Sequence, residues 1–297
     1  MTLIAFALIF ASVFMHAAWN FLSKKVNPSP AFYCLAAAVG GIFWLPAAFF
    51  SQVPLGELPW KFWGVFLISN FFEVLYFVAL ARGYRRGDIS LVYPLGRALP
   101  VIMVAVVTTL CGIGRQPSPM ALAGMAVIFF GVLVMPLPSW RDFKLRTYCT
   151  KVLFWVVMIG VGTTGYTIFD SMAMKMLEEV PGRSGLYRSI MYLCLVQTGI
   201  TVTMAGPVLC RKSQRDELRK LLGSFSPYLT GIFSASAYIL VLRAMNFVTN
   251  VSYLQAFRQM SLPLGVLAGI FILREPCPMP KAVGILLVVS GLVMTAF

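Results

Sequence analysis

The sequence has few charged residues, one histidine and no paired cysteines, and each shortage excludes a class of protein. Only 11% of the 297 residues are charged, whereas water-soluble domains carry about 25%, so the chain is not a water-soluble domain. The six cysteines have no C-x-x-C spacing and none is close to His16 in the sequence. We therefore expect no disulfide framework, metal site or cofactor. The sequence also lacks a phosphate-binding glycine loop, which excludes ATP as a direct energy source.

Apolar residues take the place of the missing charges. The chain is 59% hydrophobic with a mean hydropathy of +0.84, and its apolar stretches are long enough to cross a bilayer as helices. We predict an all-α polytopic membrane protein with ten transmembrane helices and no large extramembrane domain. The predicted spans are 3–22, 30–50, 62–82, 89–111, 118–137, 151–172, 185–207, 225–244, 249–271 and 280–297. The first span lacks a basic leader and contains polar side chains, so we expect a membrane helix there rather than a cleaved signal peptide.

The glycines of the fifth predicted span recur in the tenth. Gly124 and Gly131 correspond to Gly284 and Gly291, a shift of 160 residues. Glycines seven residues apart lie on one helix face and let two helices approach closely, so we assign these four to packing.

Polar residues repeat at a similar spacing. Arg97 in the fourth span matches Arg258 in the ninth, a shift of 161 residues, and the segment His16–Asn20 matches Tyr166–Asp170, a shift of 150. Each segment places a ring, an aromatic residue and a polar side chain on one helix face. We predict two inverted five-helix repeats, the architecture of many secondary transporters, whose binding site lies where the halves meet. The predicted boundaries are 1–137 for the first repeat, 138–150 for a cytoplasmic linker and 151–297 for the second repeat.

The basic residues predict the orientation of the chain. Loops that follow odd-numbered spans hold 16 of the 24 Lys and Arg residues, and the opposite loops hold six. The positive-inside rule places the first set in the cytoplasm and both termini outside the cytoplasmic (inner) membrane. The net charge of +14 then indicates contact with lipid headgroups, not with nucleic acid. The basic run Arg211–Lys220 is predicted to be an amphipathic loop on those headgroups.

Prolines inside predicted spans indicate where helices are weakened. Pro94 and Pro100 lie in the fourth span, and Pro263 lies in the ninth, its repeat equivalent. Each proline removes a backbone hydrogen bond, which membrane proteins tolerate where protein groups or a watery cavity satisfy the backbone. Both halves thus point to a central cavity beside these spans, although a packing kink explains either proline taken alone equally well.

Ionisable residues inside the spans are few. A charged side chain at mid-bilayer costs about 2.5–3.5 kcal/mol, so each needs a partner, a cavity or a function. Besides His16, and apart from Lys and Arg residues near the span ends that we count with the loops, the spans contain two acids, Glu73 and Asp170, and two bases, Arg97 and Arg258. Arginine keeps its proton and forks onto carboxylates or phosphates. The two arginines are predicted either to bind an anionic group of a substrate or to pair with buried acids and carbonyls.

Glu73 is the most informative of these residues. It shares a helix face with Asn70, Tyr76 and Phe77 by i, i+3 and i+4 spacing. Burial favours the protonated form of a carboxyl group, so Glu73 suits proton coupling or the binding of a substrate amine. The alternative is a static salt bridge between Glu73 and Arg97.

Aromatic and amide side chains complete the predicted site. Stacked rings commonly form the wall around a cation or an amine, although in a sequence so rich in Phe some rings serve only packing. Asp170 either lines the cavity or lies at the membrane interface. The predicted substrate-binding residues are His16, Trp19, Asn20, Glu73, Tyr76, Tyr93, Arg97, Tyr166, Asp170, Tyr238, Gln255 and Arg258.

Three segments of the sequence resemble the drug/metabolite transporter superfamily, in its ten-helix EamA-type branch. They are HAAWNFLSKK (16–25), ALARGYRRGDISLVYPLGRALP (79–100) and FILREP with the glycine-bearing last span (271–291). The resemblance implies two inverted halves, alternating access and a small organic solute bound among the first four helices of each half. It also implies an acidic residue after the penultimate helix of each half, which is Glu275 here. The first half has Arg115 or nearby Gly114 instead, so we expect a structural or loop-capping role for Glu275.

These observations favour a secondary transporter over other membrane proteins. The expected substrate is a small polar or zwitterionic metabolite, such as an amino acid or an amine, exported by a proton gradient or by exchange. A carrier of cations, quaternary amines or drugs is the main alternative, and a passive channel is a weaker one. A membrane enzyme would need converging acids, a histidine pair or a nucleophile with its base, which this sequence does not offer. A duplicated chain holds both halves of its cavity, so we expect a monomer in the lipid bilayer.

Overall fold

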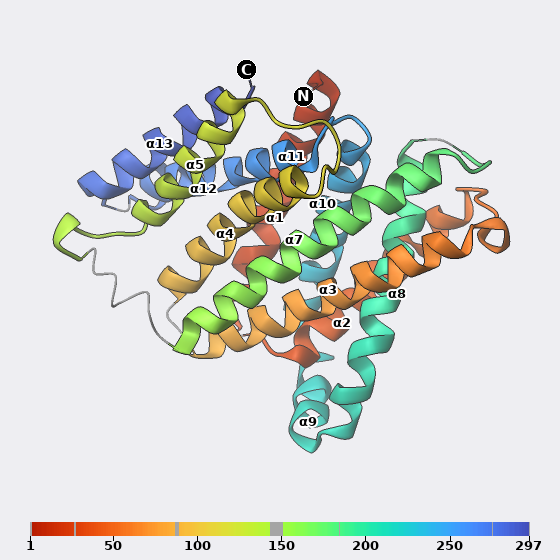
Figure 1. Ribbon diagram of the computed structural model, residues 1–297. Coiled ribbons are helices and arrows are strands. Elements are labelled where there is room, and N and C mark those ends of the chain that lie inside the picture. Colours follow the sequence, from red (N-terminus) through yellow and green to blue (C-terminus); the bar gives the residue numbers. More distant parts are fainter. Residues whose placement is uncertain are drawn as a thin grey trace.

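The computed structural model describes residues 2–26, 28–86, 89–142, 151–183, 185–274 and 276–296, and these residues form helices and connecting turns without a strand (Figure 1). The helices of the first half are α1 (Leu3–Lys25), α2 (Pro30–Phe49), α3 (Trp60–Arg86), α4 (Ile89–Leu110) and α5 (Pro119–Val134), with the short 3-10 helices η1 (Leu55–Glu57) and η2 (Trp140–Asp142). Those of the second half are α7 (Lys151–Glu178), α8 (Leu186–Cys210), α9 (Lys212–Leu221), α10 (Phe225–Met245), α11 (Val251–Phe257), η3 (Arg258–Met260), α12 (Ser261–Leu273) and α13 (Met279–Ala296).

Each predicted span coincides with helical structure, and in the part of the chain that the structure describes seven helices are long and apolar enough to cross a membrane. These seven are α1, α2, α3, α7, α8, α10 and α13. The apolar parts of α4 and α5 are shorter, at Pro94–Leu110 and Pro119–Val134, and the ninth predicted span is divided into α11, η3 and α12. The all-helical, multi-pass membrane fold is therefore confirmed, whereas the ten-span, two-repeat layout remains a prediction.

Local sequence signals set the starts of several helices. α2 begins at Pro30 after Ser29, whose hydroxyl accepts a hydrogen bond from the backbone N–H of Phe32. α5 begins in the same way, at Pro119 after the capping residue Ser118. A serine N-cap satisfies one of the free amides of the first turn, and proline at the first position needs no hydrogen-bond acceptor.

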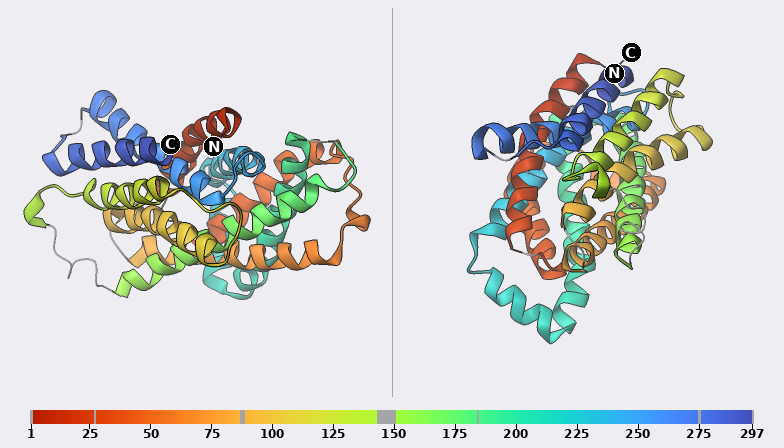
Figure 2. Two further views of the ribbon diagram at one scale, coloured as in Figure 1. Left: turned by 45° about the horizontal axis from the view of Figure 1, so that its top comes forward. Right: turned by 90° about the vertical axis from the view of Figure 1, so that its left-hand side faces the viewer.

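The most extensive helix contacts join the two halves of the chain. α3 packs along α7, α1 along α10, α2 along α8 and α5 along α13. Figure 2 shows the last pair side by side in both views, with α5 in yellow-green and α13 in dark blue. Neither half is therefore a separate globular unit.

The repeated glycines lie where α5 crosses α13. A Cβ atom added at Gly131 would lie 2.9 Å from the carbonyl oxygen of Gly284, and one added at Gly291 would lie 2.6 Å from the carbonyl oxygen of Gly124. Only glycine permits such close approach of two helix backbones. The assignment of these four residues to packing is confirmed.

A second close crossing brings α3 against α7. A Cβ atom added at Gly162 would lie 2.8 Å from the backbone nitrogen of Tyr76, and one at Gly165 would overlap the ring of Phe72. The crossing brings the face of α3 that carries Glu73 and Tyr76 against α7, where the rings of Tyr76 and Tyr166 meet with centroids 5.7 Å apart.

One end of the molecule gathers basic loops around α9. The guanidinium of Arg85, at the end of α3, pairs with Glu217 of α9 at 2.8 Å. The backbone N–H of Ala31 donates to the Gln214 side chain at 3.2 Å. The prediction of a loop over Arg211–Lys220 is wrong, because Lys, Arg, Glu, Gln and Leu are strong helix formers and make this run α9.

The opposite end carries the chain termini and the less basic loops (Figure 1). The backbone N–H of Arg183 donates to Ser51 at 2.8 Å, so the connection after α7 meets the one after α2. The N–H of Arg115 donates to the carbonyl of Thr249 at 3.0 Å, so the connection after α4 meets the one after α10. The predicted segregation of the loops to two faces therefore matches these contacts.

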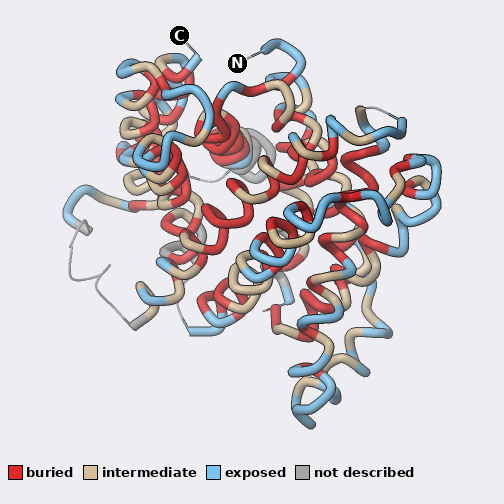
Figure 3. The backbone as a smooth tube through the Cα atoms, turned by 45° about the vertical axis from the view of Figure 1, so that its right-hand side comes forward, coloured by how far each residue is buried: buried red, intermediate tan, exposed pale blue. Residues whose placement is uncertain are grey.

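The burial pattern is that of a protein surrounded by lipid. Figure 3 shows buried residues along the inner faces of the helices and exposed residues at the loops and on the outer faces. Many exposed side chains are large and apolar, and contiguous apolar surface marks contact with membrane. Examples are Leu3, Phe49, Trp60, Leu110 and Phe225.

Candidate substrate-binding site

Two small cavities adjoin each other inside the helix bundle. The first has a volume of about 30 Å³ and the second about 50 Å³. Trp19, Tyr76, Tyr166 and Arg258 line both cavities and form their common wall. Each cavity has room for only a few water molecules.

The first cavity is basic. Arg97 of α4 and Arg258 of η3 line it together with the amides of Asn20 and Gln255. Gly96 and Pro100 of α4 also line it, as expected from the proline pattern of the fourth span.

The second cavity contains an acid and several rings. Glu73 lines it, and its side chain is 5% exposed. Phe77 and Tyr238 add rings to those of the common wall, and His16 presents its imidazole. A carboxyl group among aromatic rings is the chemistry that binds an amine or another cation.

Ten of the twelve predicted site residues line one or both cavities. The first cavity is lined by Trp19, Asn20, Tyr76, Arg97, Tyr166, Gln255 and Arg258. The second cavity is lined by His16, Trp19, Glu73, Tyr76, Tyr166, Tyr238 and Arg258. The side chain of Tyr93 lies outside the described residues. Asp170 is the one described member of the set that lines neither cavity.

Arg97 holds the broken ninth span. Its Nη2 donates to the backbone carbonyl of Arg258 at 3.0 Å and to the hydroxyl of Ser261. The carbonyl lies at the C-terminal end of α11, where a cation also complements the helix dipole. Among the described residues, Arg97 Nε has no hydrogen-bond partner.

The break itself follows from the sequence of the ninth span. Pro263 cannot donate a backbone hydrogen bond, and the three residues Arg258–Met260 before it form a 3-10 turn instead of α-helix. The predicted weakening is confirmed there. In the fourth span, α4 runs through Pro94 and Pro100 without a break in the helix, and the weakening expected there stays a prediction.

Arg258 is buried at the meeting point of the two cavities. Its Nη1 donates to the side-chain oxygen of Gln255 at 3.3 Å, and its guanidinium lies within hydrogen-bonding reach of the Tyr166 hydroxyl. Its exposed fraction is 6%. Arg258 is therefore held by neutral groups of α11 and α7 and retains its charge toward both cavities.

Glu73 takes part in none of the ion pairs found among the described residues. The side chain of Tyr238 lines the same cavity as Glu73. The alternative of a static Glu73–Arg97 bridge is therefore absent from this structure, because Arg97 is turned to the Arg258 carbonyl instead.

Asp170 is satisfied by hydroxyl groups. Ser69 and Tyr238 donate to its two oxygens, and Tyr192 donates to Oδ1 at 2.7 Å. The side chain is fully buried. Three donors around one carboxylate fix its position and tie α3, α8 and α10 to α7.

Trp19 determines the proton position on His16. The indole N–H of Trp19 donates to His16 Nδ1 at 2.8 Å, so Nδ1 is an acceptor without a proton, and in the neutral ring the proton lies on Nε2. Nε2 is buried without a partner among the described residues, and His16 lines the second cavity. His16 thus offers one N–H donor to a ligand there.

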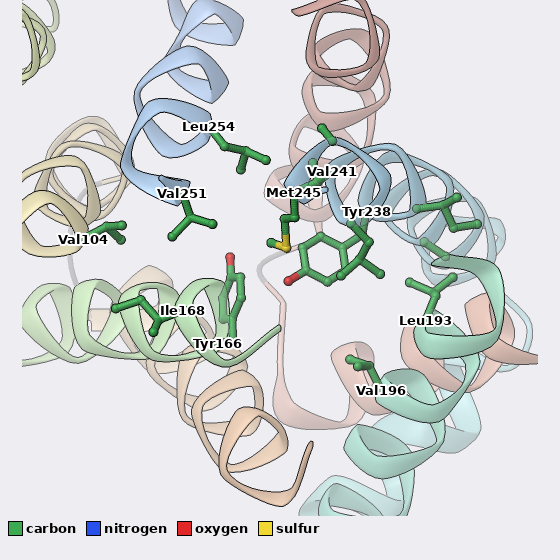
Figure 4. Packing of buried hydrophobic residues seen from close by; sticks show 14 of the residues in the cluster. Val104, Tyr166, Ile168, Leu193, Val196, Tyr238, Val241, Met245, Val251 and Leu254 are labelled. Carbon is green, nitrogen blue, oxygen red and sulfur yellow. The ribbon is translucent and has the colours of Figure 1, made fainter. Parts of the chain in front are cut away.

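Three tyrosines form a continuous aromatic row through the site. The rings of Tyr166 and Tyr238 meet edge to face with centroids 5.9 Å apart, and Tyr76 meets Tyr166 in the same way at 5.7 Å. Figure 4 shows Tyr238 of α10 directed toward the ring of Tyr166 of α7. The row comes from both halves of the chain.

Several lining residues were missed from the sequence. Leu80 and Tyr84 of α3 line the first cavity, and they follow Glu73 by seven and eleven residues, which is the spacing of a single helix face. Gln197 of α8 lines the second cavity, and its position as an amide inside an apolar span was a usable signal. Glu275 lies outside the described residues.

The geometry defines a multi-pass helical membrane protein with two small polar cavities between its halves. Residues 3–137 match the model of the EamA-like transporter family, which confirms the resemblance seen in the sequence. A solved crystal structure, described only as that of a protein, matches 99% of this chain and 98% of its own chain, with a TM-score of 0.67 and 14% sequence identity. At that identity the likeness shows the fold alone. No curated protein matches the sequence.

Proposed function

We propose that the chain is a secondary transporter that exports a small zwitterionic metabolite, an amino acid or a related amine, across the cytoplasmic membrane. The family match and the shared fold support a transporter of the drug/metabolite type. The observation that carries the choice of substrate is the pairing of two adjoining cavities, one with Glu73 and the other with Arg97. A carboxylate and a guanidinium on either side of one aromatic wall match the two charged ends of an amino acid.

Alternating access is supported by the size of the cavities and by the helix contacts. Cavities that hold a few waters must widen to admit a metabolite. In the predicted repeats, α1, α2, α3 and α5 correspond to α7, α8, α10 and α13. When each helix is replaced by its counterpart, the α1–α10 contact becomes the α7–α3 contact, and the α2–α8 and α5–α13 contacts stay the same. Inverted repeats that rock about a central site predict this pattern. We place the basic end with α9 in the cytoplasm and the termini outside.

Glu73 is our assignment for the proton-coupling group. Tyr238 donates its single hydroxyl proton to Asp170, so toward Glu73, which lines the same cavity, its oxygen can serve only as an acceptor. A protonated Glu73 completes that hydrogen bond, whereas an ionised Glu73 is free to take the ammonium group of a substrate. Exchange of a proton for an amine at one carboxylate is a physical basis for coupling.

A carrier of amines or quaternary cations is the second candidate. The second cavity alone contains the rings and the carboxylate that such a cation needs. Arg97 would then serve only as the cap of α11.

Counterflow in liposomes tests both candidates. Purified protein is reconstituted in vesicles loaded with an amino acid, its decarboxylated amine or a quaternary amine, at two pH values. Saturable counterflow of the amino acid that changes with pH supports the zwitterion carrier. Counterflow of both amines without the amino acid favours the cation carrier, and flux without saturation or counterflow contradicts both.

A further inference from the structure

A third cavity lies outside the substrate site, at the basic end of the molecule. Its volume is about 220 Å³, several times that of either internal cavity. The last turns of α3, the start of α2 and the start of α9 form its walls.

The charge of this cavity is strongly positive. Four arginines line it, namely Arg82, Arg85, Arg86 and Arg211. Arg85 is paired with Glu217 at 2.8 Å. The ion pairs among the described residues include no carboxylate for the other three arginines. An uncompensated group of guanidinium forks is the chemistry that binds phosphate oxygens.

Two of the arginines are held in place by an aromatic ring. The guanidinium groups of Arg82 and Arg86 lie 4.8 Å and 5.6 Å from the centroid of the Trp155 ring. Stacking on one indole fixes both side chains beside the cavity. Tryptophan is typical of the membrane–water interface, which agrees with a position of these guanidinium groups near the lipid headgroups.

The helix on the other side of the cavity also lies at the lipid boundary. α9 has no buried residue, and large exposed apolar side chains flank it, with Leu209 52%, Leu222 54% and Phe225 84% exposed. A polar helix between apolar side chains is the arrangement of a segment that rests on a bilayer surface.

We infer that this cavity, defined by Arg82, Arg85, Arg86 and Arg211, binds the phosphate group of an anionic phospholipid. The ring contacts and the apolar residues beside α9 favour a lipid over a dissolved phosphate. A bound lipid would connect α3 and α2 of the first half to α9 of the second. The inference does not depend on the proposed substrate or on transport.

Thermal unfolding of the full chain in vesicles tests this site. The protein is compared in phosphatidylcholine alone, in phosphatidylcholine with phosphatidylglycerol, and in phosphatidylcholine with inorganic phosphate in the buffer. A double variant, Arg86→Ala with Arg211→Ala, removes two cations from the cavity. The matched control, Arg219→Ala with Lys220→Ala, removes two cations from α9 that do not line it.

We expect phosphatidylglycerol to raise the unfolding temperature of the wild type and the control, and the cavity variant to lose more than half of that rise. The pair Arg86→Lys with Arg211→Lys keeps the charge without the forks and should lose an intermediate share. If the control variant loses an equal share of the temperature rise, the effect comes from diffuse surface charge and the proposed site is contradicted. A rise with inorganic phosphate alone, or no dependence on phosphatidylglycerol, would overturn the lipid assignment.

Discussion

Arg97 donates a hydrogen bond to the backbone carbonyl of Arg258, the residue that stands 161 positions later in the matching span. The contact joins α4 to the break between α11 and α12 and lies at the edge of the first cavity. A ligand carboxylate in that cavity and the Arg258 carbonyl would compete for the same guanidinium. We therefore expect substrate binding and the conformation of the broken span to be connected through Arg97.

Replacing Arg97 with Lys should weaken the binding of carboxylate-bearing substrates more than that of amines. Lys keeps the charge but lacks the fork that serves two acceptors at once. Loss of a charge-assisted hydrogen bond costs about 1.5–3 kcal/mol, which corresponds to roughly a ten- to hundredfold weaker affinity. Counterflow of an amino acid and its decarboxylated amine measures the difference. Ser261→Ala, which removes only the hydroxyl partner, is the control, and an equal loss for both substrates would leave Arg97 a purely structural role.

Glu73→Gln should abolish transport, or remove its pH dependence, in a protein that still folds. Glutamine has nearly the same shape and keeps a donor for the Tyr238 oxygen, but it cannot release a proton or neutralise an ammonium group. The unfolding temperature should stay close to that of the wild type. Glu57→Gln, in the exposed turn η1, controls for the loss of an acid. Normal transport with an unchanged pH profile would rule out the coupling role.

Asp170→Asn should reduce stability rather than substrate affinity. The amide of Asn presents a donor to one of three hydroxyl groups that now donate to the carboxylate. An unsatisfied buried polar group costs about 1–3 kcal/mol, seen as a lower unfolding temperature. Ser69→Ala removes one donor and should cost less. An unchanged unfolding temperature with weaker substrate binding would instead place Asp170 in the transport site.

The single histidine makes the tautomer at residue 16 directly observable. In protein labelled with ¹⁵N-histidine, we expect one set of signals with Nε2 protonated and Nδ1 unprotonated, because Trp19 donates to Nδ1. Trp19→Phe keeps a ring but removes the donor, and it should release this preference. A proton on Nδ1 in the wild-type protein would contradict the Trp19–His16 hydrogen bond.

The sequence predicts the membrane fold and ten of the cavity-lining residues, among them His16, Glu73 and both arginines, because apolar length and buried charge leave few alternatives in lipid. A charged side chain such as Arg97 must face the interior, and the spacing of Glu73 and Tyr76 fixes which face of α3 does so. The EamA-type resemblance, carried by segments such as His16–Lys25, agrees with the match over residues 3–137.

The sequence does not predict which side chains form hydrogen bonds with each buried polar residue. Nothing near Asp170 indicates that Ser69, 101 residues away, would satisfy it, because helical periodicity identifies a face and not the helix opposite. The same limit hid the role of Tyr192 and left the Glu73–Arg97 bridge open as an alternative. The sequence predicts a loop in place of α9 because this run is strongly polar, and hydropathy does not reveal its high helix propensity.

The most extensive helix contacts join the two halves, and this has a consequence for assembly. A chain cut between residues 138 and 150 would yield two fragments, each of which leaves the glycine face of α5 or α13 without its neighbour. Each fragment made alone should be degraded, whereas the two made together should find each other in the bilayer and restore the intact protein. The halves would then stay together without a covalent link. The close backbone contact of α5 with α13 at Gly124, Gly131, Gly284 and Gly291 would contribute to holding them.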